Sequence, residues 1–197
     1  MNTREIALVS VFSAVWVVSQ VLVGPIAHTS TLHGLVQRFM GWFLMLVLAE
    51  LTNRFGRVSL MATIGAFATR MLRYTAVLYV WTVGLGYALG GVAFDALFFV
   101  PRSGRLRGTG RTGYLAIASL LSGIVAIVPY TLYRLASIGP TAFLFWLPGY
   151  VSREAVDVGL NVLGTLMATL VVPRAKIALP ILNESKAEPG THAKESS

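Results

Sequence analysis

The sequence contains no cysteine and few charged residues. None of its 197 residues is Cys and only 12% are Asp, Glu, Lys or Arg, about half the share found in an ordinary soluble domain. The lack of Cys excludes disulfides, thiolate metal sites and cysteine nucleophiles. With 55% hydrophobic residues and a mean hydropathy of +0.71, the composition predicts an integral membrane protein. The chain has room for about six or seven spans and excludes a large soluble catalytic domain.

Six apolar segments, separated by Gly, Pro and Arg residues, predict six transmembrane helices. They are Ile6–Val23, Gly34–Leu51, Val58–Met71, Val77–Val100, Gly113–Arg134 and Phe145–Val172. We therefore expect an all-α integral membrane protein, a bundle of six transmembrane helices within residues 1–175. Residues 176–197 are polar, and we expect them to form a disordered C-terminal tail.

Acidic residues are scarce, with 8 Asp and Glu against 16 Lys and Arg, which gives a net charge of +8. Basic residues collect in the cytoplasmic loops of membrane proteins. An even number of spans with both termini inside places most of the basic residues in cytoplasmic segments. Four of them, Arg102, Arg105, Arg107 and Arg111, lie close together between the fourth and fifth segments. The charge therefore predicts a multi-pass protein of the cell membrane with cytoplasmic N and C termini, and no nucleic-acid partner is needed to explain it.

The sixth segment carries the strongest candidate site. Tyr150, Glu154, Asp157 and Asn161 are spaced i, i+4, i+7 and i+11, and so share one helix face, with Arg153 on its flank. Ionisable groups inside a bilayer cost several kcal/mol unless they are paired or face water. The stripe predicts one wall of a substrate pocket. The alternative is an ion pair between Arg153 and Asp157 that only holds the bundle together.

Further candidates lie at the outer ends of the second and third segments. Gln37 and Arg38 lie one turn into the second segment from its outer end. The outer end of the third segment carries Arg70, Arg73 and Tyr74. If these ends converge with the sixth segment, their guanidinium groups suit a carboxylate or phosphate on the substrate. The alternative is that Arg38 snorkels to the lipid headgroups and that Arg70 and Arg73 bind lipid phosphate.

The first outer loop and the start of the last segment add polar and aromatic groups. His28 and His33 flank a polar loop that would close over a bound solute. Two His residues without a nearby carboxylate or Cys make an incomplete metal shell, so no metal or other cofactor is expected. Trp146 and Tyr150 are the preferred pair for stacking on a flat ring.

Three local patterns resemble one known family. Residues 3–8 (TREIAL) lead into a first helix with small residues at Ala7, Ser10 and Ala14; residues 24–27 (GPIA) follow that helix; and the last helix begins with residues 148–150 (PGY). Together with six spans, they resemble the substrate-binding S components of energy-coupling factor (ECF) vitamin transporters, most closely the hydroxymethylpyrimidine/thiamine-related branch.

The resemblance implies a capture subunit that binds a small vitamin-like or heterocyclic solute from outside and catalyses nothing itself. It also implies two kinds of partner, a transmembrane coupling protein and two cytoplasmic ATPases. Ala7, Ser10 and Ala14 would form the face that docks on the coupling protein, because small residues let helices approach closely.

A small membrane enzyme acting on a lipid or isoprenoid phosphate is the alternative function. Glu154, Asp157 and the outer arginines would then form its site. Transferases of that kind need clustered acidic residues to hold Mg²⁺. The sequence offers only two carboxylates there, which argues against the enzyme.

Overall fold

All secondary structure in the described part of the chain is α-helical. The computed structural model describes residues 2–27, 33–72, 78–99 and 109–178, with the side chains of residues 2–22, 37–72, 78–99 and 110–174. The helices are α1 (Thr3–Ala27), α2 (His33–Thr52), α3 (Arg57–Leu72), α4 (Leu78–Phe99) and α5 (Thr109–Ala178). The prediction of an all-α protein is thus confirmed.

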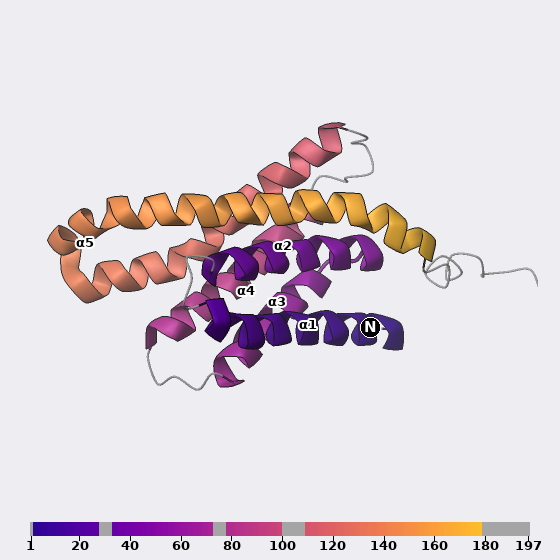
Figure 1. Cartoon of the computed structure of the whole chain (residues 1–197), viewed down its shortest axis with the longest axis horizontal. Coiled ribbons are helices and arrows are strands. Elements are labelled where there is room, and N and C mark those ends of the chain that lie inside the picture. Colours follow the sequence, from indigo (N-terminus) through magenta and orange to yellow (C-terminus); the bar gives the residue numbers. More distant parts are fainter. Residues whose placement is uncertain (1, 28–32, 73–77, 100–108, 179–197) are drawn as a thin grey trace, which may run out of the picture.

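The described residues form five helical elements rather than the six separate helices that we expected. The residues between Arg134 and Phe145, which we expected to connect two spans, are helical except at Gly139, where φ is 77° and ψ is 164°. Glycine adopts positive φ without a Cβ clash, and the ring of Pro140 suits the first turn of a new helix. As Figure 1 shows, α5 therefore folds back on itself. We call residues 109–138 its first arm and residues 140–178 its second arm.

The second arm also runs further than expected. We placed the boundary between the bundle and its tail after residue 175, whereas α5 continues to Ala178. Residues 179–197, the rest of the predicted disordered tail, lie outside the described residues.

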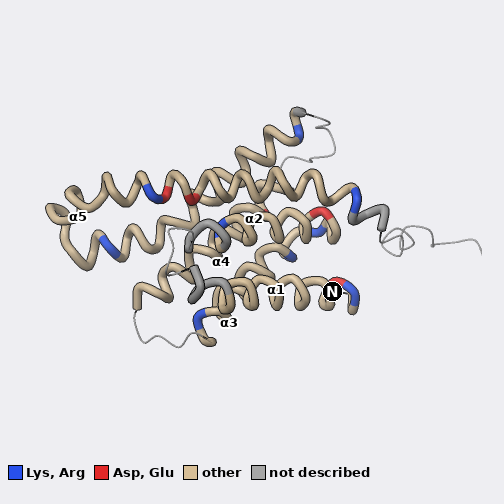
Figure 2. Tube along the Cα trace, viewed as in Figure 1, with Lys and Arg blue, Asp and Glu red and all other residues tan. Residues whose placement is uncertain are grey.

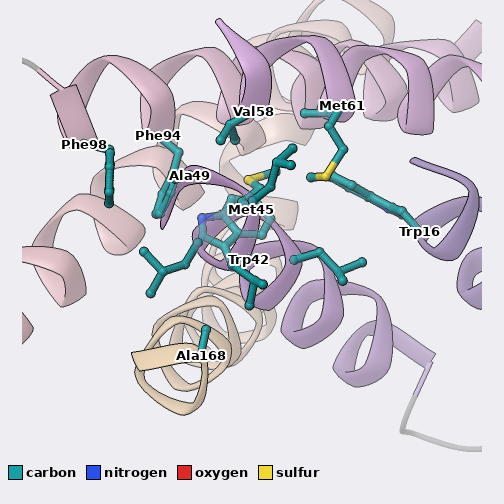
Figure 3. Packing of buried hydrophobic residues seen from close by; sticks show 14 of the residues in the cluster. Trp16, Trp42, Met45, Ala49, Val58, Met61, Phe94, Phe98 and Ala168 are labelled. Atoms are coloured by element: carbon teal, nitrogen blue, oxygen red, sulfur yellow. The ribbon is translucent and has the colours of Figure 1, made fainter. Parts of the chain in front are cut away.

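Helix α2 lies at the centre of the hydrophobic core. Figure 3 shows its residues Trp42, Met45 and Ala49 in the middle of the buried cluster. Trp16 from α1 and Phe94 from α4 are buried in the same cluster. Helix α2 contacts α1, α3, α4 and α5, so its buried side chains are surrounded by other helices.

Helix α4 approaches its neighbours closely through glycines. A Cβ atom on Gly86 would overlap the backbone carbonyl oxygen of Ala126 in the first arm. A Cβ atom on Gly91 would overlap Ala62 of α3. Such close backbone contact at small residues is typical of helix pairs in membranes.

Three described stretches are long and apolar enough to cross a membrane. They are Thr3–Leu22, Leu78–Phe99 and Gly110–Arg174, the last of which includes both arms of α5. Large apolar side chains also cover much of their outer surface, for example Leu22, Phe145 and Leu170. These helices indicate a membrane-associated protein.

Ion pairs gather where α1, α3 and α5 begin and α2 ends. Glu5 contacts Arg54 at 3.1 Å and Arg57 at 2.6 Å, and Arg111 pairs with Glu50. We call this end of the bundle, defined by these five residues, the basic end. Figure 2 shows how sparse charges are elsewhere along the helices, and that the acidic residues of α5 lie in its second arm.

Candidate functional site

A buried ionic cluster joins α2 to the second arm of α5. The guanidinium of Arg38 donates to Glu154 Oε2 at 2.8 Å, and its Nε lies 3.8 Å from Asp157 Oδ2. The three side chains are only 10–14% exposed. The guanidinium also lies 5.2 Å from the ring centroid of Tyr87 on α4, so three helical elements contribute to the cluster.

The local sequence explains how these groups meet. Glu154 and Asp157 are three residues apart, so both project from the same face of the second arm. Further along that arm, Gly164 lets its backbone approach the backbone of Phe39, the neighbour of Arg38 in α2. This close contact brings α2 and the second arm together near the charged groups.

The cluster contains more negative than positive charge. Arg38 is the one basic residue that contacts the two carboxylates in the described part of the chain. Arg153 is exposed instead, and Asp157 pairs with Arg38 rather than with Arg153. Around Arg38 the structure thus shows two carboxylates, and the convergence of several arginines on an anion stays a prediction.

An aromatic stack lies next to the cluster, one turn earlier on the second arm. The rings of Trp146 and Tyr150, the pair expected to stack on a flat ring, stack on each other with centroids 4.2 Å apart and an interplanar angle of 20°. Tyr130 from the first arm packs on both, at 5.7 Å from Tyr150 and 6.3 Å from Trp146. The guanidinium of Arg134 lies 5.4 Å from the Trp146 ring centroid.

Asn161 lies one turn beyond Asp157 and is completely buried. Neither its Oδ1 nor its Nδ2 has a hydrogen-bond partner in the structure. Gly123 of the first arm leaves the space that the amide occupies, because a Cβ there would lie 2.5 Å from Nδ2. Asn161 thus extends the polar face of the second arm into the core, as its spacing predicted.

Beyond Asn161, buried hydroxyl groups continue the polar face. Trp42 Nε1 donates to Ser122 Oγ at 2.8 Å, and Thr165 Oγ1 donates to Ser119 Oγ at 2.9 Å. These bonds hold α2 and both arms of α5 together, because they satisfy polar atoms that would otherwise be buried without partners.

The other predicted binding residues are only partly described. Arg70 is buried, with its side chain against Gly84, one turn from Tyr87 on α4, and Gln37 is half-buried with no partner at Nε2. Three more candidates, His28, Arg73 and Tyr74, and the side chain of His33, lie outside the described residues.

The residues predicted to dock a partner lie on the outside of the bundle. Ala7, Ser10 and Ala14 are all exposed on α1. An apolar groove of about 400 Å³ follows the same helix, lined by Ala14, Val15, Val18, Ser19 and Leu22.

Sequence reasoning did not single out Asp95, although an ionisable residue within an apolar segment is a signal in itself. The residue is completely buried near the end of α4. Its Oδ2 accepts hydrogen bonds from the backbone N–H of Gly56 at 2.7 Å, and from the N–H and hydroxyl of Ser59 at 3.2 and 2.7 Å. Asp95 therefore caps the start of α3 from a different helix.

The chemistry of the cluster is that of polar recognition. Two carboxylates, one guanidinium and several aromatic faces can bind and orient a small molecule. In the described part of the chain, His, Asp and Glu side chains do not gather in threes that could hold a metal ion. Comparisons of the chain with protein-family models, with curated proteins and with solved structures find no match.

Proposed function

We propose that the protein is the substrate-capture (S) subunit of an ECF-type importer. In this proposal it is a multi-pass protein of the cell membrane with six spans, the two arms of α5 counting as the fifth and sixth. Both termini are cytoplasmic. The cluster around Arg38 binds a small vitamin-like or heterocyclic solute from the outer side.

The observation that carries the proposal is the buried cluster of Arg38, Glu154 and Asp157 beside an aromatic stack. Buried charges are expensive in a bilayer, and a charged pair often contributes less stability than apolar side chains of the same volume. A purely structural bridge between α2 and the second arm would not need the stacked rings of Trp146 and Tyr150 one turn away. Charged and aromatic groups together are typical of a site that binds small molecules.

The position of the cluster along α2 agrees with this orientation. Arg38 lies near the start of α2, and Glu50, which pairs with Arg111 at the basic end, lies near its finish. Twelve residues of helix cover roughly 18 Å. If the basic end is cytoplasmic, as the distribution of Lys and Arg favours, the cluster lies in the outer half of the bundle.

The exposed small residues of α1 support the partner side of the proposal. Ala7, Ser10 and Ala14 offer a surface on which another helix can pack closely. The proposed occupant is the transmembrane coupling protein, which in turn binds two cytoplasmic ATPases that supply the energy.

A membrane enzyme acting on a lipid phosphate remains the alternative. Its metal would have to bind Glu154 and Asp157, and both carboxylates contact Arg38. A divalent cation would therefore compete with an ion pair that is already formed. This competition is why we favour solute capture.

The test is to identify the ligand that co-purifies with the detergent-extracted protein by mass spectrometry. Capture predicts a small solute with the wild type that is lost from the double variant E154Q/D157N. The control is Glu50→Gln, which removes a carboxylate paired with Arg111 at the basic end and should retain the solute. A tightly held lipid phosphate would favour the enzyme, and a solute retained by E154Q/D157N would refute the assigned site.

A further inference from the structure

We infer that the solute is an organic cation, such as a protonated amine or amidinium, and that Arg38 competes with it for Glu154 and Asp157. This inference rests on the proposed capture function and deepens it. The sequence alone favoured the opposite sign of charge, because the predicted site was rich in arginine.

The charged side chains around Arg38 decide the sign of the charge that the solute carries. Arg38 faces two carboxylates, Glu154 Oε2 at 2.8 Å and Asp157 Oδ2 at 3.8 Å. One positive and two negative groups leave an excess of one negative charge in a region where all three side chains are at least 86% buried. Electrostatic interactions are strong where little water is present, so the excess favours a cation and disfavours a carboxylate or phosphate.

The longer of the two contacts made by Arg38 shows which carboxylate is the better partner for a bound solute. At 3.8 Å, Asp157 is paired with Arg38 but lies beyond hydrogen-bond distance, whereas Glu154 accepts a direct hydrogen bond. Asp157 therefore keeps acceptor capacity for an N–H donor of the solute. The buried amide of Asn161, one turn further, has both a donor and an acceptor without a partner and is positioned to complete the recognition.

The aromatic rings at this end of the bundle already bind positive charge. Arg38 lies over the ring of Tyr87, and Arg134 lies over the ring of Trp146. Aromatic faces attract cations through the quadrupole of the ring. A solute that carries its charge on a flat, delocalised group, as an amidinium does, would match both the carboxylates and the half-buried aromatic stack.

Such a cation could belong to a free solute or to the ammonium headgroup of a lipid. Both share the chemistry that the carboxylates recognise. The experiment therefore has to separate the charge of the ligand from its source.

Three probes of nearly equal shape test the charge: benzamidinium (+1), benzamide (neutral) and benzoate (−1). Their affinities are measured by isothermal titration calorimetry on the full-length protein in a neutral detergent. We expect benzamidinium to bind at least tenfold more tightly than benzamide, with benzoate weakest. Equal affinity for the three, a preference for benzoate, or no binding of benzamidinium would overturn the inference.

Two variants then test the competition with Arg38. Glu154→Gln removes the charge excess and should lower benzamidinium affinity more than tenfold. The double variant R38Q/E154Q restores the excess without the guanidinium, so benzamidinium should bind at least as tightly as to the wild type. This pair also avoids leaving two buried carboxylates without a counter-ion, and thermal unfolding of each variant verifies that it folds. Loss of binding in R38Q/E154Q would show that Arg38 assists the ligand rather than competing with it.

A further titration tests whether the bound cation is a free solute or a lipid headgroup. Phosphatidylethanolamine is added to the benzamidinium titration, with phosphatidylglycerol as the anionic control. A free solute predicts that neither lipid displaces benzamidinium. Displacement by phosphatidylethanolamine alone would uphold a cation site but contradict the capture of a free solute. Conversely, a co-purified anionic solute whose binding depends on Arg38 would support the capture function but refute the inference that the solute is a cation.

Discussion

The guanidinium of Arg38 lies 2.8 Å from the carboxylate of Glu154, although 116 residues separate the two in the chain. The contact joins the start of α2 to the second arm of α5. It also decides the charge of the candidate site, because Asp157 adds a second carboxylate to the same guanidinium.

Neutralising Arg38 should destabilise the fold more than neutralising either carboxylate. Arg38→Met leaves Glu154 and Asp157 buried together without a counter-ion, and removing one partner of a buried ion pair costs about 3–5 kcal/mol. Glu154→Gln leaves Arg38 with Asp157 and should cost less. Thermal unfolding in detergent measures both, and equal losses would contradict the shared role of Arg38.

Removing the carboxylate of Asp95 should loosen the start of α3. Asp95→Ala leaves the N–H groups of Gly56 and Ser59 without their acceptor, at a cost of about 1–3 kcal/mol. Hydrogen exchange should then accelerate at these two amides. The control Ser59→Ala removes only the hydroxyl bond and should have a smaller effect; a larger effect for the control would argue against capping by Asp95.

A methyl group on Gly86 should separate α4 from the first arm of α5. The new Cβ would overlap the carbonyl oxygen of Ala126, and forcing extra volume into a close-packed contact costs about 1–3 kcal/mol. Gly159→Ala is the matched control, because its Cβ would meet nothing within 4 Å and alanine favours helix. We expect a lower melting temperature for G86A and an unchanged or higher one for G159A.

Larger side chains on the small-residue face of α1 should block partner docking but not solute binding. The triple variant A7L/S10L/A14L enlarges three exposed positions, so the capture subunit should still bind its solute while uptake into cells expressing the complete importer falls. Val92→Leu, at an exposed position of α4, should leave uptake unchanged. Normal uptake by the triple variant would remove this face from the docking surface.

The sequence determined the all-α class and the positions of most of the helices. Long apolar segments require helices, because an unpaired backbone is too costly in a bilayer, and each of the first four segments overlaps one helix of the structure. The spacing of Glu154, Asp157 and Asn161 likewise placed them on one face. Helix positions and shared helix faces are local properties, and the periodicity and hydropathy of the sequence predict them.

The tertiary structure decided which groups meet. The sequence suggested Arg153, on the same helix, as the ion-pair partner of Asp157. The packing of α2 on the second arm instead places Arg38 beside Asp157 and leaves Arg153 exposed. The structure also shows helix up to Gly139 and beyond it, so that two expected spans lie within the single element α5. Pairing between distant residues depends on helix contacts that no local pattern encodes, and here it turned an apparent surplus of arginine into a cluster with excess negative charge.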